Sequence, residues 1–143
     1  MRFIGISDYP LGSIKPEVMQ ILRMAEALVL QGCRVILYIP SGQRTSWTDI
    51  EQIYGRFRVH FPIRTIKDIG IPKQVTKLPS ILGRLAFHCW SLFRALVIKS
   101  QIISLDEIIM TRNIYIAWLQ TKFNKPVIFE AISLPSKGQL PLL

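Results

Sequence analysis

The sequence alternates short, almost continuous apolar runs with segments in which apolar residues recur every three or four positions. A short apolar run is typical of a strand covered on both faces, and a spacing of three or four is typical of a helix. Strands that alternate with helices predict an α/β fold with a mostly parallel sheet and right-handed crossovers. The expected strands are residues 2–7, 34–40, 57–63, 106–112 and 125–131.

The helices are predicted from start and stop signals as well as from spacing. Pro16 suits the first position of a helix, where its missing N–H is not needed, and Gly32 suits the position after the last turn. Thr48 and Glu51 match a capping box, in which two side chains bond to the backbone N–H groups of a helix start. We expect one helix after Pro16, a short one over about 49–54, a long amphipathic one after Pro79, and one over 113–123.

Length and charge limit the classes of protein to consider. The chain has 143 residues, which predicts one domain over 1–143 with a sizeable core. Its formal net charge of +9 favours an anionic partner such as nucleic acid, acidic lipid or a phosphorylated substrate. Its two cysteines lie far apart and no signal peptide fits the first strand, so we expect a cytoplasmic protein. The longest apolar window, 78–99, carries Arg84 and Arg94, so we expect no membrane span.

The loop after the first strand contains Gly12 and Ser13 and leads into a helix N-terminus. The free N–H groups and the dipole of a helix start can hold an anion or a hydroxyl-rich ligand, and these two residues would let the backbone approach it. The loop is not G-x-G-x-x-G, so it is not a dinucleotide fingerprint. The alternative is a plain strand-to-helix turn.

Three polar residues follow the fourth and fifth predicted strands, at the carboxyl ends where parallel sheets bind ligands. Arg112 there could reach a phosphate or carboxylate, with Asn113 beside it, and the alternative is an exposed arginine next to a helix cap. Glu130 follows four residues without a polar side chain, which favours a carboxylate bonded to backbone N–H groups or to a hydroxyl ligand. The alternative is a structural carboxylate at a strand end.

No metal or cofactor site is expected. His60, His88 and Cys89 lack the companions that metal coordination needs, so we assign them structural roles. No Ser/His/Asp or Cys/His arrangement can be proposed for nucleophilic catalysis.

A basic stretch leads into the long predicted helix, which holds Phe87, Trp90 and Phe93. A basic edge beside aromatic residues suits an anionic membrane surface, and the alternative is a solvated basic face over a core helix. Nucleic acid is not favoured, because no motif that reads it is present. The basic residues are Arg56, Arg58, Arg64, Lys67, Lys73, Lys77 and Arg84.

Taken in order, three segments resemble the N-terminal domain of GT-B glycosyltransferases, in the large retaining family often called family four. ISDYPLGS (6–13) resembles the first strand and acceptor loop of that domain, and residues 17–40 resemble its next helix and strand. Residues 106–135 are similar to the segment that carries an arginine and an E-x-H element. The resemblance is weakest across 41–100.

The resemblance implies a Rossmann-like three-layer fold, here a single, incomplete GT-B N-terminal domain that binds the acceptor. In a full member a C-terminal domain binds the nucleotide-sugar donor, transfer retains the anomeric configuration, and no metal is usually needed. Gly12 and Ser13 would lie in the acceptor loop, with Arg112 and its neighbour Asn113 at the cleft. Glu130 would be the glutamate of E-x-H, whose histidine is replaced by Ile132.

The resemblance leads us to expect an acceptor-binding half that is inactive alone. The acceptor would be a glycan, a lipid or a small molecule, and the donor would act only through a missing or separate domain. A second hypothesis is a non-catalytic Rossmann-like module whose basic face binds lipid or another anion, at the inner face of the membrane. A third is a response-regulator-like domain, which needs an acidic cluster for which Asp8 and Glu130 are the candidates.

Overall fold

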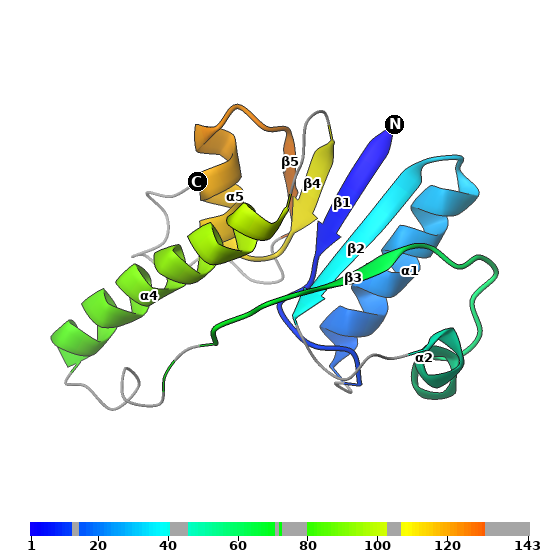
Figure 1. The fold of residues 1–143 in the computed structure, drawn as a ribbon, viewed down its shortest axis with the longest axis horizontal. Helices are drawn as coiled ribbons and strands as arrows, with labels where there is room; N and C mark the ends of the chain where they lie inside the picture. Colours follow the sequence, from blue (N-terminus) through cyan, green and yellow to red (C-terminus); the bar gives the residue numbers. More distant parts are fainter. Residues whose placement is uncertain (13–14, 41–45, 71, 73–79, 103–106, 131–143) are drawn as a thin grey trace.

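The computed structural model describes residues 1–12, 15–40, 46–70, 72, 80–102 and 107–130. Within them the chain forms a five-stranded sheet in which all strand pairs are parallel, with helices on both faces (Figure 1). This arrangement confirms the predicted α/β, Rossmann-like three-layer fold. Five residues named in the predictions lie outside the described residues: Ser13, Lys73, Lys77, Pro79 and Ile132.

The strand order is β3-β2-β1-β4-β5, so β1 lies in the middle of the sheet. The chain builds outward from β1 in one direction through β2 and β3, and then crosses back to add β4 and β5 on the other side. The point of reversal therefore falls between β1 and β4. The strands are β1 Arg2–Ile6, β2 Arg34–Pro40, β3 Ile63–Ile66, β4 Ile108–Thr111 and β5 Val127–Phe129.

Two hydrophobic cores lie on opposite faces of the sheet. Alternate residues of each strand point to opposite faces, so Phe3 packs in the core with α1 and α2, whereas Ile4 packs in the core with α4 and α5. Both faces are apolar because both are covered, as expected of a parallel sheet. The helices are α1 Pro16–Leu30, α2 Trp47–Tyr54, α4 Ser80–Gln101 and α5 Ile114–Lys122.

The predicted strand at 57–63 is wrong for most of its length, because β3 begins only at Ile63. Phe57 and Phe61 are buried beneath α2, where each meets the Trp47 ring edge to face. Pairing with β2 starts where Leu37 N–H donates to the Pro62 carbonyl. The apolar residues of this segment thus alternate as in a strand, because the segment is extended. Its aromatic side chains are buried, but within the described residues its backbone is not paired with a neighbouring strand before Pro62.

The predicted capping box is also misplaced. Ser46, not Thr48, caps α2, and its hydroxyl accepts from the Asp49 N–H while the Asp49 carboxylate accepts from the Ser46 N–H. Glu51 instead accepts a hydrogen bond from the Phe57 N–H, so its carboxylate is used elsewhere. Starting the helix two residues earlier places Trp47 on the core.

Other boundaries agree more closely with the predictions. Pro16 is the first residue of α1, and Gly32 follows it with a φ of +81°, a conformation that favours glycine. The described strands β4 and β5 are shorter than predicted, with four and three residues.

Candidate functional site

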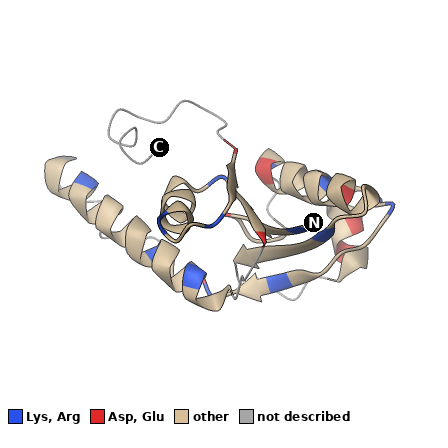
Figure 2. Ribbon diagram, turned by 90° about the horizontal axis from the view of Figure 1, so that it is seen from above, with Lys and Arg blue, Asp and Glu red and all other residues tan. Residues whose placement is uncertain are grey.

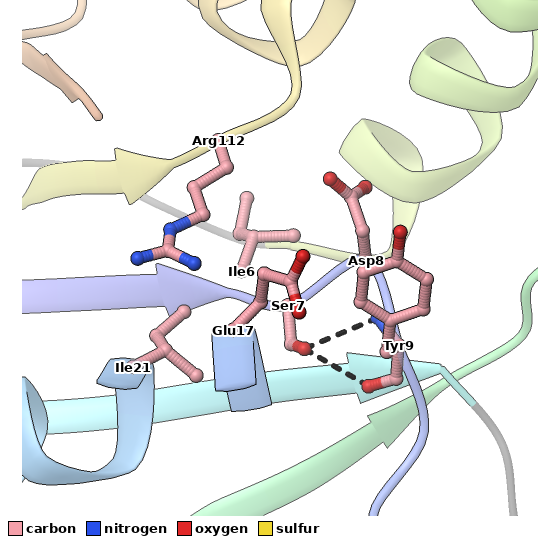
Figure 3. A pocket seen from close by; sticks show the side chains of 7 residues that line it. All are labelled: Ile6, Ser7, Asp8, Tyr9, Glu17, Ile21 and Arg112. Carbon is pink, nitrogen blue, oxygen red and sulfur yellow. Dashed lines mark hydrogen bonds between the residues drawn. The ribbon is translucent and has the colours of Figure 1, made fainter. Parts of the chain in front are cut away.

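A cavity of about 140 Å³ lies between the carboxyl ends of β1 and β4. The helices that follow these two strands cover opposite faces of the sheet, so a gap opens between them, and sheets of this topology bind ligands there. Figure 3 shows the side chains that line the cavity. They come from the end of β1, from α1 and from the residue after β4, and they are Ile6, Ser7, Asp8, Tyr9, Glu17, Ile21 and Arg112.

One wall is a tight turn closed by the Ser7 hydroxyl. Ser7 Oγ donates to the Tyr9 carbonyl at 2.9 Å and accepts from the Tyr9 N–H at 3.2 Å (Figure 3). The Ser7 N–H still donates to the Tyr38 carbonyl, so the turn begins where the sheet ends. The turn thereby holds Asp8 in a defined place beyond β1.

Asp8 supplies a largely buried carboxyl group. Burial raises the pKa of this carboxyl above its ordinary value of 3.8, although a hydrogen bond from Asn113 and the nearby Arg94 and Arg112 act in the opposite direction. The Asn113 bond joins Nδ2 to Asp8 Oδ1 at 3.0 Å. Ionising a buried carboxyl weakens the fold. A carboxyl with a raised pKa beside a cavity is therefore typical of a functional site, where such a cost is tolerated.

Asn113 itself does not line the cavity but positions the groups around it. Its Oδ1 accepts from the backbone N–H groups of Tyr115 and Ile116, at 3.0 and 3.2 Å, and so caps α5. Its Nδ2 holds Asp8. One side chain therefore fixes both the start of α5 and the acid at the end of the neighbouring strand.

Arg112 extends from the end of β4 and pairs with Glu130 at the end of β5. Arg112 Nε donates to Glu130 Oε2 at 2.9 Å, and Nη2 lies 2.9 Å from Oε1. Gln20 on α1 donates to the same Oε1. Glu130 does not line the cavity, and its described side-chain contacts are these two side chains. It neutralises the arginine and fixes the orientation of the guanidinium.

Arg112 and Glu17 both keep unused hydrogen-bonding atoms. Within the described part of the chain, Arg112 Nη1 and Nη2 and Glu17 Oε2 are buried and have no hydrogen-bond partner, since the contact of Nη2 with Glu130 is an ion pair without hydrogen-bond geometry. Leaving a buried polar atom without a partner costs about 1–3 kcal/mol. Because both residues line the same cavity, the site offers donors and an acceptor to a ligand that can accept and donate hydrogen bonds.

Gly12 lies in the loop between β1 and α1, outside the lining of the cavity. Its φ of +89° is a conformation that L side chains rarely adopt. Its N–H donates to the Tyr54 hydroxyl at 3.1 Å, which attaches the loop to α2. The structure therefore brings Arg112, Asn113 and Glu130 together, and places Gly12 apart from them.

The two histidines have aromatic and polar partners. The His60 ring stacks on Trp47, and its Nε2 lies 3.2 Å from Glu51 Oε1. His88 Nδ1 is hydrogen-bonded to the Tyr115 hydroxyl. Among the described residues, no three His, Cys, Asp or Glu side chains are grouped in a way that could hold a metal ion.

Among the polar lining residues, Ser7, Tyr9 and Glu17 were not singled out from the sequence. An acidic residue in the first turn of a helix that follows a strand end is a signal that could have pointed to Glu17. Ser7 carries no comparable signal, because its role depends on a turn that forms only at the sheet edge.

No protein-family model, curated protein or solved structure matches this chain. The geometry of the cavity and the surface of the molecule are therefore the basis for functional inference.

Proposed function

We propose that the chain is the acceptor-binding half of a glycosyltransferase, and that the cavity holds a neutral, hydroxyl-rich part of the acceptor. The observation that carries the proposal is the set of polar groups at the point where the sheet reverses: two carboxyl groups and one arginine that is already paired. This position is the usual ligand site of the topology.

The charge of the cavity favours a neutral ligand over a phosphate. Asp8 and Glu17 both line it, while the charge of Arg112 is balanced by Glu130. A phosphate would therefore meet two carboxyl groups without a free cation from the described lining residues. A hydroxyl group can donate to the open oxygen of Glu17 and accept from the Nη atoms of Arg112.

The start of α1 gives a second reason. Anions favour helix N-termini because of the dipole and the free N–H groups. Here Glu17 in the first turn of α1 places a carboxylate of the chain itself in that field. A sugar or cyclitol ring, which is neutral and carries several hydroxyl groups, fits this environment better than a nucleotide.

The size of the cavity agrees with binding part of an acceptor. Its volume of about 140 Å³ is smaller than the roughly 300–1,000 Å³ of common ligand clefts. A transferase must also stabilise the negative charge of the departing nucleotide diphosphate. The described lining residues offer no unpaired cation for that task. The donor would be bound by another domain, and we expect no transfer from this chain alone.

Nuclear magnetic resonance titration of the ¹⁵N-labelled chain tests the binding site. The probes are glucose, mannose and myo-inositol, compared with inorganic phosphate and uridine diphosphate. We expect the neutral probes to shift the amide signals of Ser7, Asp8 and Arg112, because these residues line or border the cavity. Replacing Glu17 by Gln should weaken binding about fivefold, or about 1 kcal/mol, because a hydrogen bond to a charged acceptor becomes one to a neutral acceptor.

The matched control is Asp49→Asn, which removes a carboxyl group from the first turn of α2. It should leave binding of the neutral probes unchanged. Stronger binding of phosphate or uridine diphosphate at these amides would contradict a neutral acceptor. If the neutral probes bind but no supplied donor-binding domain restores sugar transfer, the non-catalytic binding module is the correct alternative.

A further inference from the structure

The side of α4 that faces away from the sheet is an apolar stripe. Its residues are spaced by three or four positions, so they lie on one face of the helix. Leu82 and Leu85 are 60% and 62% exposed, and Phe93 and Leu96 are 50% and 49% exposed. Exposed Cys89 lies between them. A soluble helix normally carries polar residues on this side, so an exposed stripe of this length marks an interaction surface.

The opposite side of α4 is tied to the domain. Ser91, Ala95 and Ile98 are buried against the sheet and α5. Arg94 forms a two-pronged ion pair with Asp68, with two bonds of 2.6 Å. The inward side therefore cannot turn toward another partner while the domain is folded.

By length and hydropathy, α4 could cross a membrane over Ile81–Gln101, contrary to the expectation from its two arginines. The buried contacts of Ala95 and Ile98 argue against crossing, because lipid on all sides would remove these residues from the second core. The first half of the helix extends beyond the sheet (Figure 1), which leaves its apolar residues free to lie along a surface. The geometry is that of a helix that lies on a membrane.

The two helical layers carry opposite charges, as Figure 2 shows. The layer of α1 and α2 has four acidic residues and one basic residue, whereas the layer of α4 and α5 has four basic residues and no acidic one. The acidic residues are Glu17, Glu26, Asp49 and Glu51, and Arg23 is the basic one. The basic residues of the other layer are Arg84, Lys99, Lys122 and Arg94, and the charge of Arg94 is balanced by its ion pair with Asp68.

Among the described residues, the basic side chains predicted from the sequence to form one edge do not all belong to the same layer. The Arg58 N–H donates to Glu26 on the acidic layer, whereas Arg84 lies on α4. The segregation of charge between helices, rather than the run of basic residues in the sequence, orients the molecule toward an anionic surface.

We propose that α4 lies in the interface of an anionic membrane, with its apolar stripe at the boundary between headgroups and acyl chains. The ammonium group of Lys99 lies over the Phe123 ring and that of Lys122 over the Trp118 ring. The long stems of these lysines allow both charges to turn from the rings toward lipid phosphates at the same edge of the molecule. A second copy of the chain fits less well, because pairing two α4–α5 layers would bring like charges together. This inference is independent of the cavity and its ligand.

Vesicle flotation tests the proposal with the full chain. The vesicles are equimolar phosphatidylglycerol and phosphatidylcholine, compared with phosphatidylcholine alone. We expect binding to the anionic vesicles to exceed binding to neutral ones by about tenfold or more, and to weaken with added salt. The double variant Leu85→Ser/Phe93→Ser should lose binding about tenfold, because both exposed side chains would enter the membrane.

The matched control is Leu30→Ser/Ile53→Ser, which removes two side chains of 49% and 46% exposure from the acidic layer. It should bind vesicles like the unchanged chain. Thermal unfolding of both variants checks that neither loses its fold.

Cys89 allows a direct measurement of depth. In a Cys33→Ser background, an environment-sensitive fluorophore on Cys89 should shift to the blue with anionic vesicles and be quenched by spin-labelled lipids. The same fluorophore attached through the substitution Ile53→Cys, in a chain without the two native cysteines, should show neither change. Equal vesicle binding by the stripe variant, or an unshifted Cys89 label, would overturn the proposal. A dimer in solution that the stripe variant abolishes would assign the stripe to self-association instead.

Discussion

At the scale of single residues, Asp8 shows the conflict between stability and function in the cavity. Its carboxyl is removed from water and receives one hydrogen bond from Asn113. Within the described part of the chain, no cation forms an ion pair with it as Arg94 does with Asp68. A fold selected for stability alone would use an amide at this position, because an amide keeps the bond without the cost of burying a charge.

We predict that Asp8→Asn stabilises the protein at neutral pH by about 0.5–2 kcal/mol. Burial raises the pKa of Asp8, so the folded state holds the proton more tightly than the unfolded state. The favourable contribution of the acid is therefore complete below about pH 3.8, the unfolded value, and is lost as the pH rises through the folded pKa. Urea unfolding of both chains across this pH range measures the difference.

The gain from Asp8→Asn should shrink as the pH falls toward 4, because the native carboxyl is then protonated and neutral like the amide. A variant that is less stable than the native chain at neutral pH, by an amount that does not vary with pH, would contradict the account of Asp8. The exposed Asp49→Asn exchange serves as the comparison, since hydrogen bonds from Ser46 lower the pKa of Asp49.

At the scale of secondary-structure elements, Gly5 determines how closely α1 and β2 approach β1. A Cβ atom at this position would lie 2.9 Å from Leu37 Cδ1 and 3.8 Å from Ile21 Cδ1. Leu37 is fully buried, so its side chain has little room to move. The missing side chain thus serves close packing, not an unusual backbone angle.

We predict that Gly5→Ala costs about 1–3 kcal/mol of unfolding free energy, because it overpacks this contact. In the double variant Gly5→Ala/Leu37→Val the cost should be less than the sum of the two single costs by about 1 kcal/mol, since the shorter side chain makes room. Urea unfolding of the four chains measures this coupling.

The control for the coupling is Ile109→Val, which removes one carbon atom from a fully buried residue of the other core. Its cost should add to that of Gly5→Ala, because the two side chains lie on opposite faces of the sheet. Equal coupling in both pairs would show that the effect does not come from the contact with Leu37.

At the scale of the whole molecule, one sheet belongs to both cores. Neighbouring residues such as Phe3 and Ile4 enter opposite cores, so neither core can form without the strands that build the other. The tryptophans report on the two sides separately, because Trp47 packs against the first core and Trp118 against the second.

We predict that both sides unfold together. The test uses two chains, one that retains only Trp47 and one that retains only Trp118, with the other tryptophans replaced by Phe. In each chain, the urea transition measured by fluorescence should coincide with the transition measured by circular dichroism. Separate midpoints in one chain would mean that a helical layer unfolds while the sheet remains.

The sequence predicted the fold class because the information for it is local. Apolar runs of strand length, helical spacing after Pro16 and the turn glycine Gly32 each depend on neighbouring residues, and their alternation leaves few possible topologies. The same local information misled at 57–63, where Phe57 and Phe61 alternate as in a strand, and at Thr48, where Ser46 is the better cap. Phe57 and Phe61 pack on Trp47 instead of joining a strand, and the earlier cap at Ser46 places Trp47 on the core.

By itself, the sequence determined an alternating α/β chain, the start of α1 at Pro16, and the polar residues that follow β4 and β5. Only the tertiary structure decided which of these residues meet. Strand order sets Asp8 beside Asn113 although 105 positions separate them, and it joins Arg112 to Glu130 rather than to solvent. The structure also decided that α4 buries one side and leaves the other apolar side exposed, because burial depends on the packing of distant elements and not on helical spacing.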